Sequence, residues 1–311
     1  MFNTSDRVTR AMTNNGAFRV ITALTTQTVR GAVLAQQARG AIARRLGELM
    51  TGSILVREAM APDKRVQILV KARDGRTSLV ADAHPDGRNR GIVSPGLDER
   101  VAMVNNATLE VIYTLPNGIM HQGVVTLPDG GDISAGLMTY MHESEQIVSM
   151  IAVATVLDSD SDTGSSGRVG AFPVEDALTG GIRAAGGYMV QLIPGADRDT
   201  VAEMTARLEA ADQLANTLVA ADMSTTRLRC QLLGDMGVED MTETLLRFGC
   251  NCDRERVLAG LSSLPRTEIE AMIAAGAPLD ICCDACQRGY VIVVDELRSL
   301  LVGGSGSGLQ N

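Results

Sequence analysis

All six cysteines of this chain lie toward its C-terminal end, and their spacing limits what that end can fold into. None precedes Cys230, whereas a secreted protein stapled by disulfides spreads its cysteines through its core. The segment GCNCDRERV supplies Cys250 and Cys252, and ICCDAC supplies Cys283 and Cys286 about thirty residues later. Two close pairs of thiolates suit tetrahedral zinc, which takes sulfur ligands at about 2.3 Å. We therefore predict a metal or redox site built from these two pairs.

The histidines do not offer a better set of ligands. His84, His121 and His142 all lie much earlier in the sequence, so a mixed Cys and His site would need a distant partner. A four-cysteine site holding one Zn²⁺ per reduced chain is the economical interpretation. Cys282 is then a spare thiol beside the CxxC motif, and we expect its side chain to point away from the metal.

Composition and charge argue against several classes of function. The net charge is −9 and the isoelectric point is near 4.9, whereas nucleic-acid affinity comes mainly from clustered Lys and Arg. Four Phe, four Tyr and no Trp leave few platforms on which bases could stack. No apolar run reaches the length of a membrane span, and the start MFNTSDRVTRAM is too polar for a signal peptide. We expect a cytoplasmic protein that binds neither nucleic acid nor membrane.

The first and largest segment, residues 1–195, is predicted to be a mixed α/β domain. Its strand and helix patterns do not alternate regularly, which favours the α+β class over a doubly wound parallel sheet. A long Ala, Leu and Arg stretch at 27–60 has helical character, and Asp-Gly at 74–75 and 86–87 indicates hairpins. Apolar, β-branched runs predict strands at 18–24, 66–72, 79–83, 109–115, 148–157 and, as the last strand, within 186–196.

Residues 196–249 are predicted to be a helical linker. Six apolar residues recur at helical spacing and share one face of an amphipathic helix: Val201, Met204, Leu208, Ala211, Leu214 and Leu218. A second helix is expected through Leu228 and Leu232, with Cys230 between them as a buried small hydrophobic residue. A third is expected in VEDMTETLLRFG, ended by Gly249. We expect the apolar face of the linker to pack on the first domain in the resting state.

Residues 250–302 are predicted to form a small C-terminal zinc-binding domain, followed by a flexible tail at 303–311. A domain of about fifty residues buries so little apolar surface that its fold is only marginally stable without a disulfide or a bound metal. A structural zinc site contributes roughly 10–16 kcal/mol of apparent binding free energy, so this domain is expected to depend on its metal.

Local signals in this small domain predict where its elements begin and end. Asp253 is expected to cap a helix at 254–263, and Gly276 to end a second helix that Thr267 and Glu270 begin as a capping box. A strand at 290–294 and a last helix capped by Asp295 are expected to follow.

Oxidation is expected to act on neighbouring thiols. A thiolate attacked by peroxide becomes a sulfenic acid, which condenses with a nearby thiol. Cys250 has Cys252 beside it in the sequence, and Cys283 has Cys286. Each disulfide would close a tiny loop and restrict the unfolded chain by only about 2 kcal/mol. Neither would join the two halves of the domain as zinc does, so oxidation should expel zinc and unfold the domain.

The motifs CNCDRERV, LPRTEIEAMI and CDAC together resemble the C-terminal zinc domain of the heat shock protein 33 family, the redox-regulated holdase chaperones. The likeness continues in SEQI at 144–147, DGRNRGIV at 86–93 and RAAGGYMVQLIPGA at 183–196, and covers nearly the whole chain. The family pattern of CxC followed about thirty residues later by CxxC matches the four cysteines one for one. Cys282 departs from that pattern as an extra thiol beside the second motif.

The resemblance implies an ATP-independent molecular chaperone and not an enzyme. Such a chaperone is inactive while reduced and zinc-bound. Oxidation releases the zinc, unfolds the zinc domain and the linker, and exposes apolar surface that holds unfolding client proteins. Family members commonly dimerise when activated, so a homodimer is expected in the oxidised state.

Two other classes of function remain open on the sequence alone. Cys283 and Cys286 could serve a thiol-disulfide oxidoreductase, although such enzymes place CxxC at the N-terminus of a long helix, and a turn and a strand are expected here. The four cysteines could also hold a purely structural zinc in a ribbon-like binding module, because zinc-bound thiolates are often inert.

Overall fold

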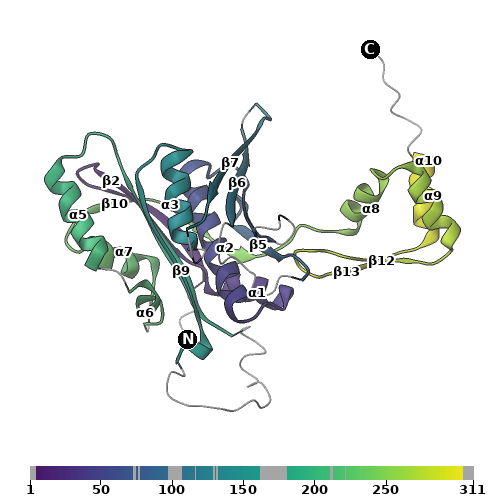
Figure 1. Cartoon of the computed structure of the whole chain (residues 1–311), viewed down its shortest axis with the longest axis horizontal. Helices are drawn as coiled ribbons and strands as arrows, with labels where there is room; N and C mark the ends of the chain where they lie inside the picture. The colour runs from purple at the N-terminus through teal and green to yellow at the C-terminus, as the bar shows by residue number, and fades with distance from the viewer. Residues whose placement is uncertain are drawn as a thin grey trace. The chain divides into compact units, whose positions relative to one another are not determined.

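Figure 1 shows the chain as a computed structural model. The chain divides into two compact units, Met1–Gly249 and Cys250–Asn311, so the first unit takes in both the predicted domain at 1–195 and the predicted linker at 196–249. The tail predicted at 303–311 lies, apart from Gly303, outside the described residues. The structure describes residues 5–72, 75, 78–96, 107–115, 117–128, 130, 132–161, 181–210, 213–220 and 222–303.

The described residues of the first unit form two sheets, which are antiparallel except for one short parallel pair, β11 with β5. The five-stranded sheet runs β10-β1-β2-β9-β8, with β1 (Arg7–Thr13), β2 (Phe18–Leu24), β8 (Ser149–Leu157), β9 (Ile182–Leu192) and β10 (Val238–Leu245). The six-stranded sheet runs β11-β5-β4-β3-β6-β7, with β3 (Val66–Lys71), β4 (Ser78–Ala83), β5 (Arg88–Val93), β6 (Thr108–Thr114), β7 (Met120–Thr126) and β11 (Arg247–Phe248).

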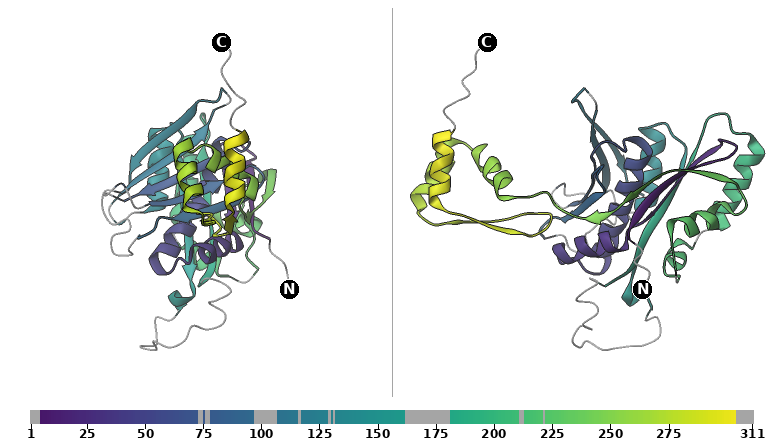
Figure 2. Two further views of the ribbon diagram at one scale, coloured as in Figure 1. Left: turned by 90° about the vertical axis from the view of Figure 1, so that its right-hand side faces the viewer. Right: turned by 180° about the vertical axis from the view of Figure 1, so that it is seen from behind.

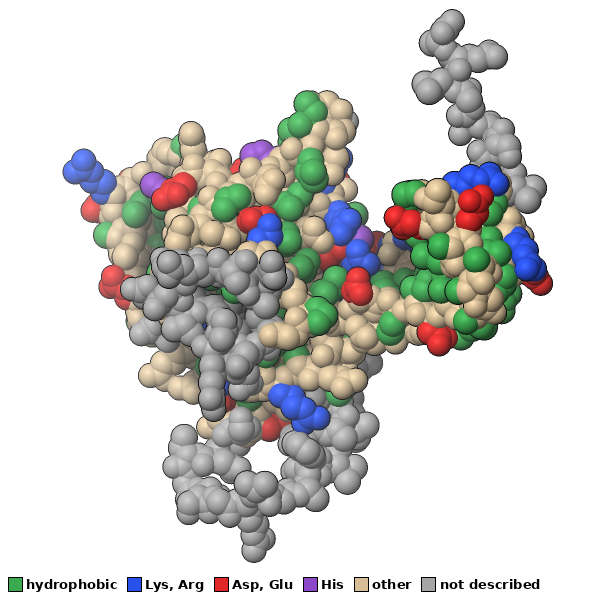
Figure 3. Space-filling view, turned by 45° about the vertical axis from the view of Figure 1, so that its right-hand side comes forward, with side chains coloured by type: hydrophobic (Ala, Val, Ile, Leu, Met, Phe, Trp, Pro, Cys, Tyr) green, Lys and Arg blue, Asp and Glu red, His purple; other side chains and the backbone are tan. Residues whose placement is uncertain are grey.

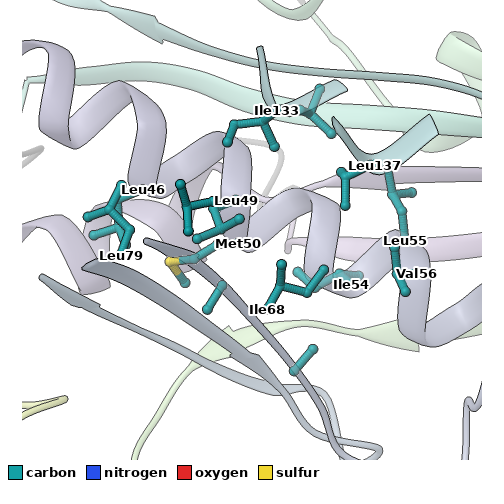
Figure 4. Close-up of a cluster of buried hydrophobic side chains, with 14 of the residues drawn as sticks. Leu46, Leu49, Met50, Ile54, Leu55, Val56, Ile68, Leu79, Ile133 and Leu137 are labelled. Atoms are coloured by element: carbon teal, nitrogen blue, oxygen red, sulfur yellow. The ribbon is translucent and has the colours of Figure 1, made fainter. Parts of the chain in front are cut away.

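The core of this unit forms around one long helix. Helix α2 (Gly40–Met60) packs against strands of both sheets and is buried along most of its length, which explains why its sequence is apolar on more than one face. In Figure 4, Leu46 lies beside Leu79 of β4 and Ile54 lies beside Ile68 of β3. Helices α1 (Thr26–Gln36) and α3 (Ile133–Glu143) pack beside α2 and also contact strands of both sheets.

Most of the predicted strands are confirmed. Strands β2, β3, β4, β6, β8 and β9 occupy the expected runs, and the antiparallel pairs β3·β4 and β4·β5 confirm both predicted hairpins. The predicted helical stretch is two helices, because Gln37 ends α1 in the left-handed conformation with φ at 51°. Strands β1, β5 and β7 were not predicted, since charged and polar residues interrupt their apolar pattern.

Three helices of the predicted linker pack together against the five-stranded sheet: α5 (Arg198–Ala210), α6 (Leu214–Leu218) and α7 (Thr225–Leu233). Their apolar residues form one buried cluster with residues of β2, β8 and β9, which confirms the predicted packing. Among the predicted face residues, Ala211 lies outside the described residues. The linker residues buried in this apolar cluster are Met204, Leu208, Leu214, Leu218, Met223, Leu228, Leu232 and Leu233.

The third linker helix was predicted wrongly, because residues 238–245 form β10. This strand pairs with β1 from Arg7↔Leu245 to Thr13↔Val238, with one register shift that leaves out Met241. The Glu, Met and Leu residues of the segment favour a helix locally, but an otherwise unpaired sheet edge offers a full ladder of backbone hydrogen bonds. The linker is therefore part helix and part strand.

The second unit is small, and its elements surround a thin core. They are α8 (Arg254–Ser262), α9 (Arg266–Ala275), β12 (Leu279–Cys282), β13 (Gly289–Ile292) and α10 (Val294–Gly303). The apolar cluster of this unit contains four buried side chains, Ile269, Tyr290, Ile292 and Leu297. Figure 3 shows hydrophobic side chains at its surface between the charged ones. An apolar core this small does not stabilise a unit by itself, so a further cross-link such as a bound metal or a disulfide is needed.

The predicted caps of this unit are partly confirmed. The Asp253 side chain caps α8 by accepting a hydrogen bond from the Arg256 amide at 2.8 Å, and Gly276 ends α9 with φ at 69°. The capping box at Thr267 is wrong, because α9 already begins at Arg266, directly after Pro265. Asp295 likewise lies inside the first turn of α10 rather than before it.

Candidate metal centre

Two separate stretches of the second unit supply the four cysteines. Cys250 and Cys252 lie in the segment that leads into α8, where the Asp253 cap fixes the start of the helix. Cys283 and Cys286 lie in the turn between β12 and β13, which pair as an antiparallel hairpin from Leu279↔Ile292 to Cys282↔Gly289. A cap and a hairpin thus bring each pair of cysteines into position.

Backbone hydrogen bonds shape the CxxC turn. The Cys283 amide donates to the Arg288 carbonyl at 3.0 Å, and the Gln287 amide donates to the Cys283 carbonyl at 2.8 Å. Gln287 adopts a positive φ of 56°, and Ala285 is buried beneath the turn. The turn therefore directs both the Cys283 and the Cys286 side chain toward the CxC segment.

The four sulfurs meet in one cluster. The Sγ atoms of Cys250 and Cys283 are 3.7 Å apart, those of Cys252 and Cys286 are 3.2 Å apart, and all four lie within 4.8 Å of one another. Four sulfurs at about 2.3 Å from a tetrahedral zinc ion are about 3.8 Å from each other. The cluster therefore fits a tetrahedral ion with little rearrangement. No other group of His, Cys, Asp or Glu gathers this way in the described part of the chain.

The surroundings favour protonated thiols as long as no cation is present. Burial raises the pKa of Cys283, and burial together with the sulfurs of Cys252 and Cys283 raises the pKa of Cys286 to about 12. A metal must therefore displace protons as it binds, and the charge of a divalent cation would stabilise the resulting thiolates. The chemistry of the donors, four sulfurs and no oxygen, suits zinc.

The two remaining thiols lie outside the cluster. Cys282 is exposed on β12, and its Sγ lies 3.4 Å from the side-chain oxygen of Gln287, so it points away from the cluster as expected. Cys230 was predicted to be buried and is exposed. Leu228 and Leu232 do face the core, but a helical residue two positions from each lies on the opposite face.

An ion pair that the sequence did not indicate joins the two halves of the unit. The Arg254 guanidinium donates to both oxygens of Glu296, at 2.7 and 2.6 Å, and to the Val291 carbonyl at 2.7 Å. Arg254 begins α8, beside the CxC segment, whereas Glu296 and Val291 follow the CxxC turn. No local spacing signals a contact between residues 42 positions apart.

Comparisons with known proteins agree over nearly the full length. The family model described as Hsp33 protein matches residues 6–293. The chain belongs to the Hsp33 family.

Its relatives in this family are distant in sequence but alike in length. The 33 kDa chaperonin of Lactococcus lactis subsp. lactis is 28% identical over 306 residues, which cover 95% of this chain and 99% of the relative. The 33 kDa chaperonin of Streptococcus uberis is 25% identical over 311 residues, which cover 95% of this chain and 98% of the relative. The crystal structure of the 33 kDa chaperonin from Thermotoga maritima superposes on this chain with a TM-score of 0.78 at 20% sequence identity. The match covers 96% of this chain and 98% of the Thermotoga chain, so the fold is shared.

Proposed function

We propose that this member of the Hsp33 family is a redox-regulated, ATP-independent holdase in the cytoplasm. The reduced chain holds one zinc ion through Cys250, Cys252, Cys283 and Cys286 and is inactive. Oxidation forms the Cys250–Cys252 and Cys283–Cys286 disulfides, which leaves zinc without its thiolates. The second unit and the linker then unfold, expose apolar surface and bind unfolding client proteins, and the oxidised chain forms a homodimer.

The four-sulfur cluster in a unit with a thin core is the observation that supports this proposal. The cluster joins the segment before α8 to the turn after β12, 33 and 34 positions apart in the sequence. A metal bound there contributes roughly 10–16 kcal/mol, more than a core of four buried side chains can supply. Loss of the thiolates therefore removes the main tie across the unit.

The pairing of the sulfurs decides whether oxidation opens the unit. In each pair, two thiols give up two electrons and two protons to a peroxide, whose O–O bond breaks as an S–S bond forms. Disulfides across the cluster would close long loops, stabilise the fold by about 4 kcal/mol each and still tie the two halves together. The local pairs Cys250–Cys252 and Cys283–Cys286 are worth about 2 kcal/mol each and leave the halves free. Only the local pairing produces a switch.

The linker offers the surface that opening would expose. Its buried Leu and Met side chains pack with Phe18, Val20, Tyr188 and Val190 of the five-stranded sheet. If the linker helices left the sheet, apolar residues would become exposed both on the helices and on the face of the sheet that they cover. Contiguous apolar surface of this kind binds exposed hydrophobic segments of other proteins.

The other classes of function have less support. The CxxC motif lies in a turn between two strands, not at the N-terminus of a helix that would lower a thiol pKa. A net charge of −9 does not favour nucleic acid, and no helix in the described ranges is long and apolar enough to cross a membrane. The relatives are named chaperonins.

A comparison of oxidised and reduced protein tests the proposal. We expect peroxide-treated protein to suppress the light scattering of a thermally unfolding client, and reduced, zinc-bound protein to leave it unchanged. Equal suppression by both forms would refute the switch. Repeated turnover in an insulin-reduction assay would instead identify an oxidoreductase, and tight, salt-sensitive binding of DNA or RNA would identify a nucleic-acid module.

A further inference from the structure

Tyr290 is a buried tyrosine whose hydroxyl group has no conventional partner. It lies on β13, where Tyr290 and Ile292 face the interior of the second unit and Val291 faces outward. The side chain is 9% exposed, and its hydroxyl oxygen forms no hydrogen bond of standard geometry with the described residues. A buried hydroxyl without a partner is costly, so such a group calls for an explanation.

The side chains near this hydroxyl belong to the metal centre. Tyr290 and Cys252 pack in the same apolar cluster. Cys252 is the largest of the influences that raise the pKa of Tyr290. Tyr290, and after it Cys252 and Cys286, raise the pKa of Arg288, which precedes β13 and is exposed. The Tyr290 side chain therefore lies beside Cys252, and Arg288 interacts electrostatically with both groups.

The donor and acceptor capacities of these groups fix how they can interact. Arg288 has only donors, so Tyr290 can meet it only through the lone pairs of its oxygen. The single hydroxyl proton then remains for the sulfur of Cys252. A neutral thiol is a weak acceptor, whereas a thiolate accepts a strong, charge-assisted hydrogen bond. The missing partner of the hydroxyl is therefore a sulfur that carries negative charge, as it does when it binds a metal.

We propose that the Tyr290 hydroxyl donates a hydrogen bond to Cys252 Sγ in the metal-bound state and thereby sets the affinity of the site for zinc. This inference rests on the zinc site of the proposed function. Tyr290 is a positioning residue in this scheme, because it acts through a ligand and does not touch the metal. A donor to a ligand stabilises the thiolate and fixes its orientation, as groups around metal ligands commonly do.

The hydrogen bond has a consequence for the switch. A thiolate that accepts a hydrogen bond has less electron density available for attack on an oxidant. Tyr290 therefore favours the closed, zinc-bound state in two ways, by tighter binding and by slower reaction of Cys252. Removal of the hydroxyl alone is expected to make the reduced chain release its zinc more readily under the same peroxide concentration.

The test replaces the hydroxyl and keeps the ring. The reduced full-length Tyr290→Phe variant is titrated with zinc against a chromogenic chelator, beside wild type and a Tyr113→Phe control that removes a tyrosine hydroxyl from the first unit. We expect the zinc Kd of Tyr290→Phe to rise about 10-fold, the low end of the usual range for such groups, and that of the control to stay unchanged. Circular dichroism at saturating zinc checks that the variant folds.

Cobalt(II) provides a readout that loss of packing alone would not change. A hydrogen bond lowers the energy of the sulfur lone pair, so Tyr290→Phe should move the sulfur-to-cobalt charge-transfer band to lower energy. An unchanged band together with an unchanged zinc Kd would overturn the inference and leave the proposed function intact. A wild-type chain that binds no zinc would overturn both.

Discussion

At the scale of single residues, the position of each sulfur separates the four cluster cysteines from the other two. The spacing of CxC and CxxC was enough to exclude Cys282, because the two-residue gap of the second motif pairs Cys283 with Cys286. The exposure of Cys230 also follows from helical geometry, but the apolar neighbours Leu228 and Leu232 masked it. Tyr290 could not be connected with Cys252 from the sequence, because their shared apolar cluster depends on the fold.

A Cys282→Ser variant should retain one zinc per chain. Its Sγ lies beside Gln287, outside the sulfur cluster, so its loss removes no ligand. Metal analysis of the reduced, dialysed protein measures this directly. Cys283→Ser is the matched control and should lose its zinc, because it deletes one of the four sulfurs at the adjacent position. Loss of zinc from Cys282→Ser would mean that the ligand set is wrong.

Glu48 should make stability depend on pH. Burial raises its pKa from 4.5 to about 7, despite its ion pair with Arg45 at 3.1 Å. The folded state holds this proton more tightly than the unfolded state does. The contribution of protonated Glu48 to the free energy of unfolding is therefore fully present below pH 4.5 and is lost as the pH rises through about 7. The loss amounts to about 3 kcal/mol at 1.4 kcal/mol per pKa unit.

A Glu48→Gln variant tests this, because its side chain stays neutral at every pH. Between pH 5 and 8, the free energy of unfolding of wild type should fall relative to that of the variant, as measured by urea denaturation. Parallel pH profiles for the two proteins would show that the burial of Glu48 has no such effect.

At the scale of elements, β10 is where local preference and tertiary pairing disagree. Most of its side chains are exposed, so burial contributes little to its position. Pairing with β1 and polar contacts hold it: Arg229 pairs with Asp240, Arg7 with Glu243 at 3.1 Å, and Arg10 with Thr242 at 2.7 Å. Strands whose side chains alternate clearly, such as β3, could be predicted. A strand defined mainly by a distant partner could not.

An Arg229→Gln variant should loosen β10. Arg229 lies on α7 with its side chain 8% exposed, so its ion pair with Asp240 ties the strand to the helices of the linker. Since Asp240 is 72% exposed, the pair is worth only about 1 kcal/mol. Amide hydrogen exchange in 238–245 should then be about five-fold faster.

The control for this measurement is Arg266→Gln, which removes an exposed ion pair with Glu270 in the second unit. It should leave exchange in 238–245 as in wild type. Equal exchange in Arg229→Gln and wild type would show that backbone pairing alone holds β10.

At the scale of the whole molecule, the chain combines a large unit with a deep core and a small unit that lacks one. Figure 2 shows the same elements of both units from two further sides. The α+β class, the clustering of the four cysteines and the packing of the linker helices could be predicted, because each depends on local periodicity or spacing. Sheet order and the Arg254–Glu296 pair could not, because they join residues far apart in the sequence.

Removal of zinc from the reduced chain should affect the two units differently. A strong chelator should expose α8, α9 and α10 to proteolysis, because the proposed zinc ion would link the two halves of that unit. Helix α2 and its core should remain resistant, since their packing involves no cysteine. Mass spectrometry of the fragments locates the cuts, and readdition of zinc should restore resistance. Equal cleavage with and without chelator would contradict the metal dependence.

In the proposed switch, loss of zinc on oxidation activates the chaperone. The most direct measurement follows zinc release with a chromogenic chelator, and the light scattering of a thermally unfolding client, in one peroxide-treated sample over time. Suppression of aggregation should rise only as zinc appears in solution, and the activated protein should contain the Cys250–Cys252 and Cys283–Cys286 disulfides by peptide mapping. Full suppression before any zinc is released, or disulfides that join the two pairs, would contradict it.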